Sequence, residues 1–198
     1  MTPTTKSHFL AKVRHISARH RPPPNPAISG LEIMKIIDTY PLPAEGQPLM
    51  FANLFAGCGG LSLVGLQGVF AVERDKMAFS TLSANLLEGR DVPAHQFAWP
   101  TWLEKKAWGI DDILEQHPSE LSKLKGKVHV LTGGPPCQGF SFAGKRLESD
   151  PRNKLFEKYV EMVEAIQPAA LVLGNVPGIK VAPPFDHLKT STGVFFCA

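Results

Sequence analysis

Short apolar runs alternate along the chain with amphipathic segments and with turns rich in glycine and proline. The apolar runs are brief, which predicts five buried strands, at residues 49–55, 68–72, 93–98, 127–131 and 169–173. Helical patterns lie between them, at residues 77–87, 112–125 and 150–166. Because strands alternate with helices, we predict an α/β fold with a doubly wound, Rossmann-like parallel sheet.

The domain organisation follows from where this pattern begins and fades. Residues 1–48 form a basic, proline-rich extension and linker, residues 49–180 carry the strands and helices, and residues 181–198 form a tail. Residues 1–30 contain lysine and arginine but no acidic residue. Such a basic segment either contacts a nucleic-acid phosphate backbone or is a disordered, solvated leader. We favour the solvated leader, because tails with mixed basic residues are common in proteins.

Composition narrows the class of protein. The 198-residue chain is 43% hydrophobic and 20% charged, which are globular values, and its net charge of +3 does not by itself indicate nucleic-acid binding. Its three cysteines have no paired spacing, which indicates a reducing compartment and argues against a metal site. No apolar run approaches the ~20 residues of a membrane span, and no apolar signal segment follows the N-terminus. We therefore expect a cytoplasmic protein with no membrane partner and no metal.

The segment Gly133-Gly-Pro-Pro-Cys-Gln-Gly-Phe-Ser141 directly follows the fourth expected strand. Two glycines and two prolines exclude both a helix and a ladder, so a rigid turn is predicted. Cys137 lies in this turn, beyond the carboxyl end of the strand, where ligands gather in open α/β sheets. A thiol there is a candidate nucleophile if its pKa is lowered, and the alternative is a small buried residue in a turn.

A glycine-rich loop, Ala56-Gly-Cys-Gly-Gly-Leu-Ser62, follows the first expected strand, and Glu73 ends the second. Glycine allows close approach of a ligand to the backbone, and a following helix start offers free N–H groups. An acid at the end of the second strand is placed to accept hydrogen bonds from ribose hydroxyls. Together they indicate an adenosine-containing cofactor; the alternative is a structural turn and a surface acid.

The chain resembles the DNA (cytosine-5)-methyltransferase family of bacterial type. Gly-Pro-Pro-Cys-Gln-Gly-Phe-Ser141 is similar to its catalytic loop, and Phe55-Ala-Gly-Cys-Gly-Gly-Leu-Ser62 is similar to its S-adenosylmethionine loop. Asp150-Pro-Arg-Asn-Lys-Leu155 and Asn175-Val176 match two further blocks. The resemblance covers about residues 49–180, the first half of a family catalytic domain. It implies the methyltransferase fold with strand order 3-2-1-4-5.

The resemblance also implies the reaction and the roles of individual residues. Methyl transfer from S-adenosylmethionine to C5 of a cytosine flipped out of double-stranded DNA would proceed through a covalent bond between Cys137 and C6. The implied cofactor-binding residues are Phe55, Gly57, Gly59, Gly60, Glu73, Ile110, Asp111, Pro135 and Leu155. The implied DNA-binding residues are Gln138, Ser141, Lys145, Arg146, Arg152 and Asn175.

The sequence departs from the family pattern in three places. Gly174 stands where the family has a glutamate that contacts the cytosine, so no acid is supplied there. The segment between Gly60 and Glu73 is about one helical turn shorter than usual, and the family's target-recognition region and last strands do not follow. We expect strand 169–173 to be an unpaired edge.

Three functional interpretations therefore stay open. The chain is an impaired methyltransferase, a non-catalytic remnant that binds S-adenosylmethionine, or one half of a split enzyme whose second chain supplies target recognition. A thiol hydrolase is disfavoured because no histidine flanks Cys137, and a nicotinamide dehydrogenase because the loop lacks the third glycine at dinucleotide spacing. Trp99, Trp102 and Trp108 either stack on bases or pack under a long loop, and we favour packing.

Overall fold

A computed structural model describes residue 43 and residues 47–62, 66–88, 97–136, 151–174 and 195–197; for residues 151–153 and 195–197 it describes the backbone alone. The expected extension at 1–48, apart from residues 43, 47 and 48, lies outside this part of the chain. The proposed domain boundaries therefore stay predictions.

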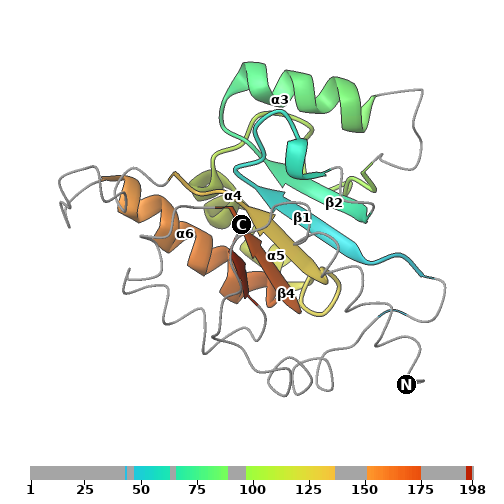
Figure 1. Ribbon diagram of the computed structural model, residues 1–198, viewed down its shortest axis with the longest axis vertical. Helices are drawn as coiled ribbons and strands as arrows, with labels where there is room; N and C mark the ends of the chain where they lie inside the picture. The colour runs from blue at the N-terminus through green and yellow to red at the C-terminus, as the bar shows by residue number, and fades with distance from the viewer. Residues whose placement is uncertain are drawn as a thin grey trace.

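The centre of the protein is a parallel sheet with strand order β2-β1-β3-β4-β5 (Figure 1). Its strands are β1 (Met50–Leu54), β2 (Gln67–Val72), β3 (Val130–Gly133), β4 (Ala170–Leu173) and β5 (Phe195–Cys197). The first four are almost wholly buried, which explains why they appear in the sequence as continuous apolar runs. The predicted Rossmann-like α/β class is confirmed, and the order of these four strands agrees with the predicted one.

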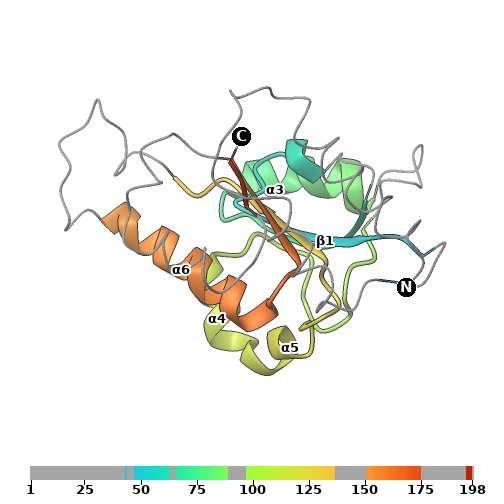
Figure 2. The ribbon, with the colours of Figure 1, turned by 60° about the horizontal axis from the view of Figure 1, so that its bottom comes forward.

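Helices cover both faces of the sheet (Figure 2). One face carries α3 (Lys76–Leu82), which continues into the π-helical stretch η2 (Ser83–Leu87). The other face carries α4 (Ile110–Gln116), α5 (Pro118–Ser122) and α6 (Pro151–Ile166). Each face has its own apolar cluster, so the sheet is the shared wall of two cores. No helix in the described ranges is long and apolar enough to cross a membrane.

A third strand was expected at 93–98. Of these residues the structure describes 97 and 98, and they do not form a strand, so the expectation is wrong there. Phe97 and Ala98 lie beside β2, but only one hydrogen bond joins them to it, from Ala98 N–H to the Gly68 carbonyl at 2.8 Å. The ring of Phe97 covers Gly68 so closely that a Cβ there would lie 2.4 Å from it. This packing of a ring on a glycine takes the place of a strand ladder.

Two further expectations need correction. The helix expected at 112–125 begins earlier and divides into α4 and α5, because Pro118 starts a new helix and lacks the N–H that would continue the old one. The strand expected to be an unpaired edge, β4, pairs in parallel with β5, from Leu171–Phe195 to Leu173–Cys197. Part of the expected tail therefore belongs to the sheet.

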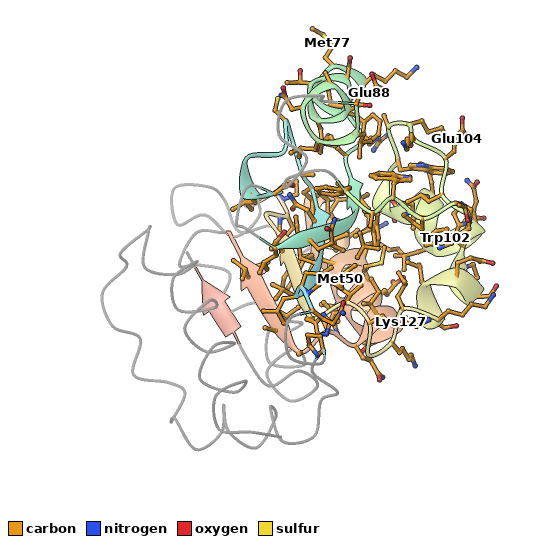
Figure 3. The ribbon with its side chains drawn as sticks, turned by 90° about the vertical axis from the view of Figure 1, so that its right-hand side faces the viewer. Met50, Met77, Glu88, Trp102, Glu104 and Lys127 are labelled. Atoms are coloured by element: carbon orange, nitrogen blue, oxygen red, sulfur yellow. The ribbon has the colours of Figure 1, made fainter. Side chains whose placement is uncertain are left out.

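The connector between η2 and α4 is packed by tryptophans, as the favoured interpretation expected. The indole N–H of Trp99 donates to the Leu103 carbonyl at 2.7 Å, and that of Trp108 donates to the Glu104 carbonyl at 2.9 Å. Trp108 is only 5% exposed. Met77 on α3 and Glu104 on the connector point away from the core (Figure 3). Trp99 and Trp102 pack against the core while staying partly exposed, so the three tryptophans contribute to the packing of this loop.

Candidate functional site

The glycine loop leaves β1 through a run of left-handed backbone. Phe55 has φ +53°, Gly57 has φ +54° and Gly59 has φ +93°. Glycine adopts these angles without the steric penalty of a Cβ, whereas Phe55 is strained there. The loop ends in a single 3-10 turn, η1 (Gly60–Ser62), in place of a long first helix within the described residues. Gly57 and Gly59 are therefore glycines that the path of the loop requires.

Glu73 lies immediately after β2 and joins this loop to the next helix. Its Oε2 accepts the Gly57 N–H at 2.7 Å, and its Oε1 accepts the Asp75 N–H at 2.7 Å. Asp75 in turn caps α3, because its Oδ1 accepts the Ala78 N–H at 2.8 Å. One carboxylate thus holds the glycine loop and the start of α3 together, at the carboxyl ends of two neighbouring strands.

The surroundings of this carboxylate fit an adenosine-containing cofactor. A Cβ added at Gly57 or Gly60 would meet no atom of the described residues within 4 Å, so in this part of the structure the loop backbone borders open space. Gly59 faces the opposite way, where a Cβ would lie 2.7 Å from a methyl carbon of Leu86. Each oxygen of Glu73 accepts only one of these backbone N–H groups, and a carboxylate has about four acceptor positions, which leaves capacity for hydroxyl groups.

The segment expected beside an adenine ring adjoins Glu73 through the backbone. Trp108 N–H donates to the Glu73 carbonyl at 2.8 Å, which brings the start of α4 next to the end of β2. Ile110 is 3% exposed and belongs to the core, whereas Asp111 is exposed in the first turn of α4. Ile110 is therefore a buried apolar residue and Asp111 an exposed acid. Their assignment to the cofactor stays a prediction.

The carboxyl ends of β3 and β4 lie side by side. Gly174 N–H donates to the Gly133 carbonyl at 2.8 Å, and Pro135 is buried just beyond β3. A Cβ at Gly134 would lie 3.2 Å from the Gly174 carbonyl oxygen. At Gly174 itself the nearest atom to an added Cβ is the Gly133 carbonyl oxygen at 3.8 Å, an ordinary contact. The position of the absent glutamate therefore has room for a Cβ among the described residues.

Several predicted site residues lie outside the described part of the chain. Leu155 is half-buried on α6 against the core, and the side chain of Arg152, in the first turn of α6, is not described. The residues beyond the described ranges are Cys137, Gln138, Ser141, Lys145, Arg146 and Asn175. Their roles stay predictions.

The sequence reasoning missed one buried pair beneath the glycine loop. Asn53 in β1 donates from Nδ2 to Oγ of Ser62 in η1 at 2.9 Å, and both side chains are at most 2% exposed. The available signal was an amide inside the apolar strand Met50–Leu54, where every other residue is hydrophobic. The strand was predicted from its apolar residues, so the one polar residue within it was not considered as part of the site.

Comparison with known proteins agrees with this geometry. The family described as C-5 cytosine-specific DNA methylase matches residues 49–190. The chain belongs to the C-5 cytosine-specific DNA methylase family. The glycine loop, Glu73 and the residues after β3 all fall inside the matched range of this methylase-family chain.

Individual relatives of the methylase chain are bacterial type II methyltransferases. It is 35% identical to type II methyltransferase M.DdeI of Desulfomicrobium norvegicum over 131 residues, which are 64% of this chain and 28% of that protein. It is 37% identical to M1.HphI of Haemophilus parahaemolyticus over 136 residues, 65% of this chain and 32% of that protein. It is 36% identical to M.HgiGI of Herpetosiphon aurantiacus over 129 residues, 63% of this chain and 87% of that protein.

The matched region is a limited part of several of these relatives. The methylase chain spans 28% of the length of M.DdeI and 32% of that of M1.HphI. Family membership is therefore established for the sheet and the loops of this chain, and the activity of a whole methyltransferase is a separate question.

Proposed function

We propose that this chain binds S-adenosylmethionine and carries the nucleophile for methylation of cytosine at C5 in double-stranded DNA. The family uses this cofactor, and the shared region contains both loops that the reaction needs. The single observation that carries the proposal is the hydrogen bond between Gly57 N–H and Glu73 Oε2 at 2.7 Å. It joins the glycine loop to an acid on the next strand, the combination that adenosine recognition requires.

In this proposal the residues around the loop hold the cofactor. The backbone of Gly57 and Gly60 approaches it closely, because no atom in the described part of the chain lies within 4 Å of a Cβ placed at either glycine. Glu73, oriented by two backbone N–H groups, accepts hydrogen bonds from ribose hydroxyls. Pro135 and Leu155 contribute apolar contacts, and Phe55 lies against the adenine. When bound, S-adenosylmethionine supplies the methyl group.

The residues after β3 act on the base. Cys137 as thiolate would add to C6 of a flipped cytosine, which makes C5 nucleophilic toward the methyl group that a bound cofactor would supply. After C5 has taken that methyl group from the sulfonium sulfur, loss of the C5 proton would break the bond from C6 to sulfur and release the thiolate. Gln138, Ser141, Lys145, Arg146, Arg152 and Asn175 contact the DNA. A positively charged segment beside a nucleophile suits a phosphate backbone, since such contacts position the duplex without reading its sequence.

A second candidate function is cofactor binding without catalysis by this chain alone. Gly174 favours it, because a glycine cannot supply the carboxylate that the family places beside the cytosine, and such acid–base help is typically worth about 10²–10⁴-fold. In this case the chain is a non-catalytic cofactor-binding protein or one half of an enzyme completed by a second chain. The two forms differ in whether a partner restores methylation.

Calorimetric titration of the purified chain with S-adenosylmethionine tests the shared part of both candidates. We expect saturable binding that is lost in Glu73→Ala, with Glu161→Ala on the solvent side of α6 as a matched removal of a carboxylate. Equal binding by wild type and Glu73→Ala would place the cofactor elsewhere and overturn the site.

Methyl transfer to DNA separates the two candidates. Label from the cofactor that appears in DNA with wild type but not with Cys137→Ser supports the enzyme. Binding without transfer supports the second candidate, and Gly174→Glu then tests whether the missing carboxylate is the main defect. We expect no rescue by this variant when it is assayed without a partner, because the chain spans only 28% of the length of M.DdeI and 32% of that of M1.HphI.

A further inference from the structure

Three buried polar side chains lie on the face of the sheet that carries α3. Asn53 and Thr132 are fully buried, and Ser62 is 2% exposed. Asn53 and Thr132 are register partners in β1 and β3, so their side chains emerge from the same face. Buried polar groups lower stability unless they are hydrogen-bonded, so each of them needs a reason to be there.

Thr132 has a local explanation. Its hydroxyl donates to the Ala52 carbonyl at 3.3 Å, a contact between neighbouring strands that involves no loop. Asn53 differs, because its Nδ2 reaches out of the sheet to Oγ of Ser62, nine residues further along the chain. Its Oδ1 has no hydrogen-bond partner among the described residues. Among the described residues the amide is thus half satisfied, and such a group contributes little to the stability of a core.

The bond from Asn53 closes the glycine loop at its far end. The near end is held to β2, because Ala56 N–H donates to the Val72 carbonyl at 3.0 Å and Gly57 N–H donates to Glu73. Inside the loop, Gly59 N–H donates to Ala56 and Ser62 N–H donates to Gly59, both at 2.9 Å. Within the described residues, the Asn53 amide is the hydrogen bond that ties this stack of turns back to β1.

We propose that Asn53 is a positioning residue for the cofactor loop: through Ser62 it holds the turn that keeps Gly57 and Gly60 facing open space. The side chain touches no ligand and acts by fixing the loop before binding, so that less ordering remains to be done when a ligand binds. This inference rests on the proposed function for its ligand, S-adenosylmethionine. It predicts that removal of the pair weakens affinity without lowering stability.

The test is the double variant Asn53→Leu/Ser62→Ala in the full chain. Replacing both partners by apolar groups of similar shape is nearly neutral or stabilising, and it also removes the unpartnered Oδ1. We expect a Tm equal to or above that of wild type, and affinity for S-adenosylmethionine about tenfold weaker, which corresponds to ~1.4 kcal/mol. Thr132→Val, an equally buried hydroxyl removed from the same face, is the matched control and keeps wild-type affinity.

Amide hydrogen exchange gives a readout that needs no cofactor. The N–H groups of Gly59 and Ser62 are hydrogen-bonded only while the turns are closed, so they should exchange faster in the double variant than in wild type or Thr132→Val. If wild type fails to bind S-adenosylmethionine, the proposed function fails, and these two amides still decide the role of Asn53.

Unchanged affinity together with unchanged exchange in a folded double variant would overturn the proposal. A parallel loss of Tm and affinity would also overturn it, because that result describes an ordinary core contact. If the double variant does not fold, Ser62→Ala alone, which leaves β1 intact, decides by the affinity and by the exchange of the Gly59 and Ser62 amides. Its Tm does not decide, because the unpaired Asn53 Nδ2 lowers stability whether or not the bond positions the loop.

Discussion

Glu73 accepts the backbone N–H of Gly57 at 2.7 Å, although the two residues are 16 positions apart in the chain. The contact crosses from the end of β2 to the loop after β1, which are adjacent strands of the sheet. It assembles the loop and the acid before any ligand is present. Two predictions concern this junction, one for the acid and one for the loop.

Glu73→Gln should weaken binding of S-adenosylmethionine while keeping the shape of the side chain. A carboxylate accepts the N–H groups of both Gly57 and Asp75, whereas one end of an amide is a donor that cannot accept either. One N–H therefore loses its acceptor, and we expect affinity about tenfold lower by calorimetry. Glu161→Gln on α6 is the control, and equal affinity of the two variants would contradict the role of Glu73.

Cys58 should be protected from alkylation when S-adenosylmethionine is bound. Its side chain is exposed between Gly57 and Gly59, on the loop that borders open space. A ligand over this loop covers the thiol, so iodoacetamide should label it several-fold more slowly at saturating cofactor, measured by mass spectrometry of the Cys58 peptide. The peptide of Cys197, in β5, serves as the internal reference. Identical labelling rates with and without cofactor would argue against binding at this loop.

Two neighbouring glycines should respond differently to the same substitution. A Cβ at Gly133 would lie 2.8 Å from Cε2 of Tyr159 and 3.0 Å from the Leu54 carbonyl oxygen, both inside the core. Gly133→Ala should therefore destabilise by about 1–3 kcal/mol, as overpacking does. The added methyl of Gly174→Ala meets nothing closer than 3.8 Å among the described residues and should change the free energy of unfolding by less than about 0.5 kcal/mol. Chemical denaturation measures the free energy of unfolding of both variants. Equal losses would contradict the different packing of the two positions.

Stability should fall below about pH 6.5 because of His129. The side chain is 5% exposed, and its Nδ1 accepts the Met50 N–H at 3.0 Å, which needs an unprotonated nitrogen. Burial lowers the pKa of His129, so the unfolded chain takes up the proton at a higher pH than the folded one. The folded state is therefore fully favoured above the unfolded pKa and loses stability as pH falls from there through the lowered pKa.

His129→Asn provides the comparison, because the Asn Oδ1 can take the place of the Nδ1 acceptor without titrating near neutral pH. Denaturation midpoints of wild type should drop between pH 8 and pH 5.5, and those of the variant should drop less. The same decrease in both proteins would assign the pH dependence to other groups.

Much of the fold could be predicted because it is written in local patterns. The four described strands β1 to β4 are short apolar runs bounded by glycine, proline or charge, and α6 carries an apolar face behind Pro151. The glycine loop and Glu73 were found for the same reason, since each stands at the end of a recognisable strand. The predictions failed where one local sequence pattern is compatible with two different structures. Phe97 is apolar in a way that suits a strand, but its ring packs on Gly68 instead.

The sequence by itself determined the order of the elements, the parallel sheet and the residue types at its carboxyl edge, because hydrophobic periodicity and turn residues act over a few positions. Only the tertiary structure decided which of these residues meet. It oriented the Glu73 carboxylate, paired β4 with β5, and joined Asn53 to Ser62 and Met50 to His129, which are 79 positions apart. Such contacts depend on how packed strands close distant parts of the chain on one another, and no local pattern contains that information.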